Sequence, residues 1–276
     1  MNITKIELIP VTVPLEQPIG HAFYKRTNGK HVIVKIHNDE GFVGIGCSSV
    51  LASSYCMDNQ ESTMAKLKEL AQNVLLGANP MHTEMILNKV DNALRFSTLT
   101  KAPIDYALYD LKGRILGVPV YDLIGGLARE TMPVEWIITF DTTENMAAAA
   151  KKYMDAGFNS LKCKTGKDIK GAVERFAAVR AAVGPDVEIG VDMDGVFNAH
   201  DAIRLIRELE KYDLHFAEQP VSKLDIRGFV EVRKHVNTPI VADESAWSIE
   251  ETVNLINANA CDMCHLALDR IGGFRK

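Results

Sequence analysis

The hydrophobic and polar positions of the chain follow two different periods in its first 125 residues. Over residues 1–46, apolar and polar residues alternate in "KIELIPVTVPL" and "HVIVKIHNDEGFVGIG", a pattern typical of half-buried strands. The turn-forming "NDEG" in the second run predicts a hairpin. From about 60 to 125 the spacing becomes helical, and Gly117 and Pro119 end the last of these helices. The two parts together predict an α+β unit.

Beyond this unit, short apolar runs alternate with amphipathic helical segments at about 25 residues per repeat. Such alternation predicts parallel strands joined by crossover helices. Because six repeats follow one another, a (β/α) TIM-type barrel is the leading architecture and a doubly wound sheet is the alternative. With "GG" at 125–126 as the boundary, we expect a capping α+β domain at 1–125 and a barrel domain at 126–276. The strand-like runs are residues 134–140, 160–164, 187–194, 214–220, 239–245 and 261–269.

The composition of the chain argues against several classes of function. A net charge of -5 with no basic tract argues against nucleic acid as a partner. Apolar runs stay short of the roughly 20 residues of a membrane span, and the N-terminus lacks a signal-peptide layout. We therefore expect a cytoplasmic protein with no membrane partner. We also expect a homo-oligomer. The five cysteines are an odd number, and "CDMC" at 261–264 fits packed free thiols better than zinc or redox chemistry.

Polar residues stand at or near the C-terminal ends of successive predicted strands. They are separated by 28, 26 and 25 residues, so each falls one repeat after the last. In a barrel this spacing brings the side chains together at the mouth, where active sites of this fold lie. One such acidic residue is usually a helix cap, but three in consecutive repeats are harder to explain in that way. The four residues are Lys164, Asp192, Glu218 and Asp243.

Three converging carboxylates would repel one another unless a cation neutralised them. A hard divalent ion with oxygen ligands fits, so we expect Mg²⁺, or Mn²⁺, to be bound by Asp192, Glu218 and Asp243. Lys162 and Lys164 in "LKCKT" face the same side of a strand. The neighbouring charge of Lys162 should lower the pKa of Lys164 and make it a base, and Lys162 can also pair with a substrate carboxylate. A lysine base facing Mg²⁺ suits removal of a proton next to a carboxylate.

At these residues the chain resembles the enolase superfamily, in its mandelate racemase and muconate lactonizing enzyme branch. The motifs that carry the resemblance are "KCK", "VDMDG", "AEQP", "ADES" and "RIGG", in order and with family spacing, together with "PIDYALYDLKGRILGVPVYDLIGG". The resemblance runs from about residue 3 to the last residue. It implies a capping domain over a (β/α)₇β barrel, with substrate contacts from the loops at 16–30 and 47–56.

The resemblance also implies roles for individual residues. Lys164 would be the base, Lys162 its electrostatic partner, and the three carboxylates the metal ligands. Asp194 and Glu244 would lie beside these ligands, and Tyr24 and His265 are candidates for substrate contact. The implied activity is Mg²⁺-dependent removal of the α-proton of a small carboxylic acid or amino-acid derivative through an enolate. The implied enzyme is a racemase, epimerase or cycloisomerase.

Position 267 departs from the family. The resemblance places a second catalytic lysine five residues before the first glycine of "GG", and this chain has Ala267 there. Alanine cannot transfer protons, and racemisation by two bases needs one group on each face of the substrate carbon. The chain is then a one-base enzyme, such as a dehydratase of a hydroxy acid or hydroxyproline-like substrate or a cycloisomerase, or a variant disabled by a Lys→Ala substitution. His265 should face the same interior, either as a substitute acid or in packing and hydrogen bonding.

The number of repeats is a second departure, because the resemblance implies further strands beyond Lys276. We expect a fragment, a frameshifted chain or a chain completed by another copy. Two other classes of function stay open. A non-catalytic interaction protein would fit the alanine at 267 but leaves the carboxylates and the lysine pair unexplained, and a Schiff-base aldolase could use Lys164 but leaves the three spaced carboxylates without a purpose.

Overall fold

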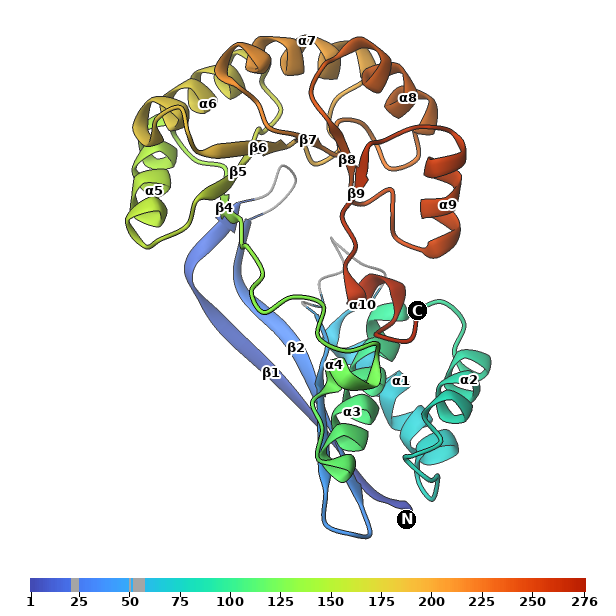
Figure 1. The fold of residues 1–276 in the computed structure, drawn as a ribbon. Coiled ribbons are helices and arrows are strands. Elements are labelled where there is room, and N and C mark those ends of the chain that lie inside the picture. Colours follow the sequence, from blue (N-terminus) through green and yellow to red (C-terminus); the bar gives the residue numbers. More distant parts are fainter. Residues whose placement is uncertain (21–24, 50, 52–57) are drawn as a thin grey trace. The chain divides into compact units, whose positions relative to one another are not determined.

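The computed structural model describes residues 1–20, 25–49, 51 and 58–276. They form two compact units (Figure 1). The first consists of Met1–Glu16, Thr27–Thr131 and Ala267–Lys276, and the second of Gln17–Arg26 and Met132–Leu266. Among the described residues, no helix is long and apolar enough to cross a membrane.

The first unit contains a three-stranded sheet in the order β1 (Ile3–Gly20), β2 (Lys25–Asn38) and β3 (Val43–Cys47). Strands β2 and β3 are antiparallel, so the predicted hairpin is confirmed. Its turn is held by Asn38, whose side-chain oxygen accepts the backbone N–H of Phe42 at 2.8 Å. Gly41 adopts a φ of 88°, a left-handed conformation that glycine reaches without steric cost.

Helices cover this sheet. They are α1 (Gln60–Leu70), a π-helical turn η1 (Ala71–Leu75), α2 (Thr83–Ala93), α3 (Thr98–Leu116) and α4 (Val120–Leu123). Strand β3 lies directly against α3 because Gly44 and Gly46 have no side chain. A Cβ atom at Gly46 would stand 2.0 Å from the carbonyl oxygen of Pro103. Helix α3 ends at Gly117 in the left-handed conformation, as the sequence predicts.

The second unit is a parallel sheet whose strands follow one another in sequence order. A doubly wound sheet reverses its strand order and carries helices on both faces, whereas here the helices line the outer side of the curved sheet (Figure 1). The expected barrel-type architecture is therefore confirmed, and the doubly wound alternative is excluded. The strands are β4 (Trp136–Ile138), β5 (Ser160–Lys164), β6 (Glu188–Asp192), β7 (Ala217–Glu218), β8 (Ile240–Ala242) and β9 (Met263–Cys264). The connecting helices are α5 (Thr143–Asp155), α6 (Ile169–Val183), α7 (Ala199–Leu209) with the 3₁₀ turn η2 (Glu210–Tyr212), α8 (Ile226–His235) and α9 (Ile249–Asn257).

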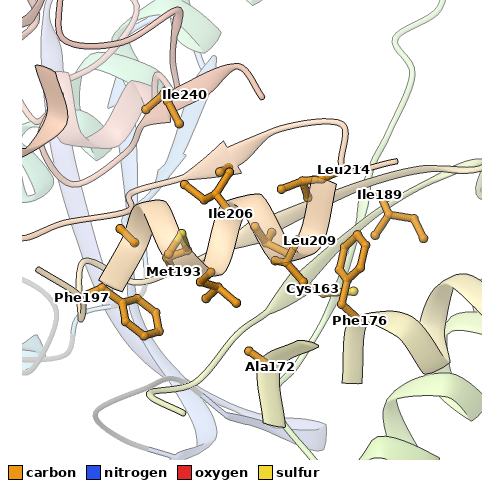
Figure 2. Close-up of a cluster of buried hydrophobic side chains, with 14 of the residues drawn as sticks. Cys163, Ala172, Phe176, Ile189, Met193, Phe197, Ile206, Leu209, Leu214 and Ile240 are labelled. Carbon is orange, nitrogen blue, oxygen red and sulfur yellow. The ribbon is translucent and has the colours of Figure 1, made fainter. Parts of the chain in front are cut away.

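The core of this unit lies between the sheet and its helices. Alternate strand residues such as Leu161 and Cys163 belong there to one buried cluster with Phe176 and Leu205, and Figure 2 shows part of this cluster. Cys163 is 2% exposed, which confirms that its side chain points to the helix layer. Each fully buried large apolar side chain contributes about 1.5–3 kcal/mol, so this face of the sheet supports the stability of the unit.

The segment after β9 corrects one expectation. The predicted sixth strand at 261–269 is wrong in its second half, because β9 ends at Cys264 and a short helix, α10 (Leu268–Ile271), follows with Ala267 as its N-cap. Pairing stops because β8 ends at Ala242 and the chain turns there, the N–H of Ala246 donating to the carbonyl of Asp243. Residues beyond His265 then have no strand end of β8 to pair with.

Candidate active site

The candidate site includes two lysines at the carboxyl end of β5. Lys162 and Lys164 pair in register with Gly190 and Asp192 of β6, so their side chains lie on the same face of the sheet, opposite the helices. Gly190 is required at this point, because a Cβ atom there would stand 2.2 Å from the ring of Phe216. The expected shared face of the two lysines is thus confirmed.

Each lysine faces carboxylates. Lys162 Nζ lies 2.8 Å from both carboxylate oxygens of Glu218 and 3.9 Å from Asp192 Oδ2. Lys164 Nζ lies 2.6 Å from Asp192 Oδ2 and also donates to Asp194 Oδ1. Both ammonium groups are nearly enclosed, with side chains 5% and 11% exposed. The lysines are therefore held by ion pairs across neighbouring strands.

This pairing overturns the expected basicity of Lys164. Burial by itself lowers the pKa of Lys164, but the charges of Asp192 and Asp194 and the hydrogen bonds to them outweigh it and raise the pKa above its usual value. Lys162 shifts in the same direction, with burial opposed by Glu218 and Asp192. The prediction of a lowered pKa is wrong for this arrangement, because the nearest charges to each lysine are negative.

The three predicted metal ligands stand where the spacing places them. Asp192 and Glu218 are the last residues of β6 and β7 and pair in register, and Asp243 follows β8 directly. All three side chains are buried, at 3%, 3% and 6% exposure of the residue. Asp192 Oδ1 also accepts the backbone N–H of Asp194 at 3.0 Å, in a turn where Asp194 has a left-handed φ of 51°. The carboxyl ends of consecutive strands thus gather these acids at one edge.

A donor group suited to one metal ion consists of Glu218, Asp243 and His265. One ligand atom of each lies within 4.8 Å of the others, so the three side chains point into one small volume. His265 Nδ1 lies 3.7 Å from Glu218 Oε1 and 3.6 Å from Asp243 Oδ1. Interaction with Glu218 raises the pKa of His265 against the opposing effect of burial. His265 faces the interior of the sheet, as expected, and it faces the acids directly.

Gln219, which sequence reasoning passed over within "AEQP", fixes the position of Asp243. Its side-chain oxygen accepts the backbone N–H groups of Asp243 and Ser245 at 3.0 and 3.2 Å. Its amide nitrogen donates to Val221 O and Ser245 Oγ at 2.9 and 2.8 Å. The residue is buried and has a left-handed φ of 44°. A buried amide directly after an acidic strand end is the signal that could have identified it.

Glu135 is a second residue that the sequence reasoning missed. It precedes β4 and is half-buried, and burial raises its pKa to about 7. Lys162 and His265 oppose this rise, while Glu218 and Asp192 add to it. Glu135 therefore shares the electrostatic environment of the site. A glutamate within the apolar run "VEWIITF" was the available signal.

The structure treats the remaining predicted site residues differently: it describes some, corrects one and leaves others outside the described residues. Asp194 is buried and binds Lys164, and Glu244 is half-buried next to Asp243. Ala267 is the N-cap of α10 and belongs to the first unit, so its expected place on the sixth strand is wrong. Tyr24 and most of the 47–56 loop lie outside the described residues.

Comparison with known proteins agrees with this architecture. Residues 3–125 match the family model of the mandelate racemase / muconate lactonizing enzyme N-terminal domain, and residues 145–276 match that of the enolase C-terminal domain-like family. An N-succinyl-L-Arg/Lys racemase of Bacillus cereus is 34% identical over 99% of this chain and 74% of its own length. A cis-3-hydroxy-L-proline dehydratase of Roseibium aggregatum is 29% identical over 100% of the chain and 75% of its own length.

Solved structures extend the comparison. The dipeptide epimerase of Enterococcus faecalis, in complex with Mg and the dipeptide L-Leu-L-Tyr, superposes with a TM-score of 0.96 at 29% identity, covering 100% of this chain and 77% of that one. The relatives thus include racemases and epimerases as well as dehydratases. With both family models matched in order, the chain belongs to the enolase superfamily, in the mandelate racemase and muconate lactonizing enzyme branch.

Proposed function

We propose that this protein removes the proton next to the carboxylate of a small amino-acid derivative, in the manner of a racemase or epimerase. The observation that carries the proposal is the pairing of two buried lysines with the acids at the ends of β6 and β7. The relatives that act as N-succinyl amino acid racemase and dipeptide epimerase support an N-acylated amino acid or a dipeptide as the substrate class.

Asp192, Glu218 and Asp243 would hold Mg²⁺ or Mn²⁺. One carboxylate oxygen of Glu218 and one of Asp243 lie within 4.8 Å of each other, and Asp192 is the register neighbour of Glu218. When bound, the ion supplies positive charge that stabilises the negative charge developing on the substrate carboxylate. The protein contributes the fixed strand ends that keep these acids in place.

Lys164 would accept the proton. Its ion pairs with Asp192 and Asp194 hold the ammonium group in one position but also favour its protonated form. Once Asp192 serves as a ligand, its charge is neutralised, so the pKa of Lys164 falls towards the range of a useful base. Lys162 then adds a second positive charge on the same face of the strand.

A second candidate is a one-base lyase, and Ala267 favours it. The family's second lysine would act from the opposite face of the substrate carbon, and alanine offers no proton there. Lys164 alone could still remove the α-proton and pass it to a β-hydroxyl group, which would leave as water as its C–O bond breaks and a C=C bond forms. The similarity to a cis-3-hydroxy-L-proline dehydratase supports this candidate.

The experiment is exchange of the substrate α-proton in D₂O, followed by NMR on the full chain with Mg²⁺ and a panel of N-succinyl amino acids, dipeptides and 3-hydroxyproline. We expect exchange with the parent and none with Lys164→Ala. A matched control is Lys170→Ala, because Lys170 is 87% exposed and pairs only weakly with Glu174. Inverted product indicates a racemase, exchange with retention a one-base enzyme, and water loss a lyase. Exchange at the parent rate in Lys164→Ala would refute the assignment of the base.

A further inference from the structure

Two of the cysteines that the structure describes lie against each other at the last strand of the second unit. Cys264 is the final residue of β9 and Cys261 precedes this strand, and their Sγ atoms are 3.7 Å apart. Both side chains are half-buried and lie beside the apolar core between the sheet and its helices. The sequence favoured packed free thiols at these positions, and the structure adds that the two sulfur atoms are in contact.

The backbone around this pair of cysteines is anchored to β8. The N–H of Asp262 donates to the carbonyl of Ile240 at 2.8 Å, and the N–H of His265 donates to that of Ala242 at 2.8 Å. The carboxylate of Asp262 accepts the N–H of Ile240 at 2.9 Å and a hydrogen bond from Arg233 of α8 at 2.7 Å. Because the segment cannot spread without breaking these bonds, the two sulfur atoms stay close together in the reduced chain.

Contact between anchored thiols favours formation of a bond between them. A disulfide bond is about 2.05 Å long, so the sulfur atoms of Cys261 and Cys264 need only approach each other from contact distance. Rotation about the side-chain bonds can supply this movement while the backbone keeps its hydrogen bonds. Since the chain between the two residues is already ordered, closing the ring costs little chain entropy.

We propose that Cys261 and Cys264 form a reversible dithiol–disulfide site that exchanges with small disulfides of the glutathione disulfide class. In the first step, the thiolate of one cysteine attacks a sulfur of the small disulfide, the S–S bond breaks and one small thiolate leaves. In the second step, the other cysteine loses its proton and attacks the protein sulfur of the mixed disulfide, which releases the second small thiolate. The two cysteines are oxidised, the small disulfide is reduced, and the two protons of the cysteine thiols end on the two small thiols.

The surroundings of the pair affect the rate of this exchange. Burial raises the pKa of Cys261, the neighbouring Cys264 adds to the rise, and Arg233 opposes it. Because the thiolate is the attacking form, exchange through Cys261 should be slow at neutral pH. The position of the equilibrium between the dithiol and the disulfide is therefore the quantity to measure.

The modification would stand next to the candidate active site in the chain. His265 follows Cys264 directly, and its Nδ1 lies 3.7 Å from Glu218 Oε1. The proposal is nevertheless independent of the proposed function, because neither step of the exchange uses Lys164 or the carboxylates at the strand ends.

The test equilibrates the full chain with mixtures of reduced and oxidised glutathione, GSH and GSSG, starting from both the reduced and the oxidised protein. After acid quenching and alkylation, mass spectrometry of the peptide that contains residues 261–264 gives the fraction with the internal disulfide. We expect half-oxidation at a ratio [GSH]²/[GSSG] above about 10 mM, because two groups joined by a short flexible linker already reach effective concentrations in the millimolar range. Sulfur atoms held in contact should exceed that range.

Two variants and one internal control accompany the measurement on the parent. Cys261→Ser should leave Cys264 as a stable mixed disulfide with glutathione, because no second thiol remains to displace it. Cys47→Ser is the matched control, since Cys47 is exposed, and it should leave oxidation of the pair unchanged. Cys163, which is 2% exposed, should stay reduced in the same samples as long as the chain is folded.

A midpoint at or below about 10 mM in the parent would overturn the proposal, because the pair would then gain nothing over a flexible linker. Accumulation of mixed disulfides at Cys261 or Cys264 in the parent would overturn it as well. Either result would leave the proposed function standing, because exchange of the substrate α-proton in D₂O tests that function separately.

Discussion

Asp105 allows a prediction whose magnitude follows from the structure. This aspartate of α3 is 1% exposed, and its Oδ1 accepts the backbone N–H of Phe274 at 2.7 Å. Burial raises the pKa of Asp105 to about 6 from the usual 3.8, although the backbone hydrogen bonds of Phe274 and Arg275 oppose the rise. In the folded protein Asp105 therefore stays protonated up to a higher pH than in the unfolded chain.

The sign of the effect on stability follows from proton linkage. Because the folded pKa is the higher one, the folded state binds more protons between pH 3.8 and about 6, and its stability falls as the pH rises through this window. At about 1.4 kcal/mol per pH unit, ionised Asp105 costs up to about 3 kcal/mol at pH 7. Asp105→Asn keeps an oxygen acceptor for Phe274 and removes the charge, so it should stabilise the first unit.

The assay is urea and thermal unfolding of parent and variant between pH 4 and 7.5, followed by circular dichroism. We expect the variant to be more stable at pH 7, with Tm raised by about 2–4 °C per kcal/mol, and the difference to vanish near pH 4. Asp110→Asn on the same helix should give no gain, because the Asp110 side chain is 27% exposed and pairs with Arg114. A variant of Asp105 that is less stable at pH 7, or a difference that does not change with pH, would show the reasoning to be wrong.

Two further predictions concern the sheet and the site. Gln219→Leu should weaken Mg²⁺ binding by about 10–100-fold, because the backbone N–H groups of Asp243 and Ser245 lose their acceptor. If calorimetry gives the same Mg²⁺ affinity for parent and variant, Gln219 does not position Asp243. Cys163→Ser should lower the free energy of unfolding by about 1–3 kcal/mol, since the side chain is buried among apolar groups, and should leave Mg²⁺ affinity unchanged.

The sequence was sufficient to predict features set by local periodicity. Alternation along β5 placed Lys162 and Lys164 on one face and Cys163 on the other, and the structure agrees. The 25-residue repeat predicted the order of the parallel strands, because each crossover helix returns the chain to the neighbouring position.

Features that depend on the register between neighbouring strands could not be predicted from the periodicity of the sequence. The spacing of Lys164 and Asp192 says that both reach the same edge, but the 2.6 Å ion pair that raises the pKa of Lys164 requires their in-register pairing. The expected strand at Ala267 was wrong for a related reason. Its apolar pattern continues past Cys264, whereas the strand needs a partner and β8 has already ended at Ala242.

The one-sided placement of helices on the parallel sheet has a consequence for engineering. Odd-numbered residues of β5 pack against helices, while Lys162 and Lys164 point to the other side. A combinatorial library that varies inward residues such as Ile137 and Met263 would leave the apolar contacts of the helix layer intact. A high fraction of the variants in such a library should fold. Selection for activity on a new substrate would then discard few variants because of misfolding.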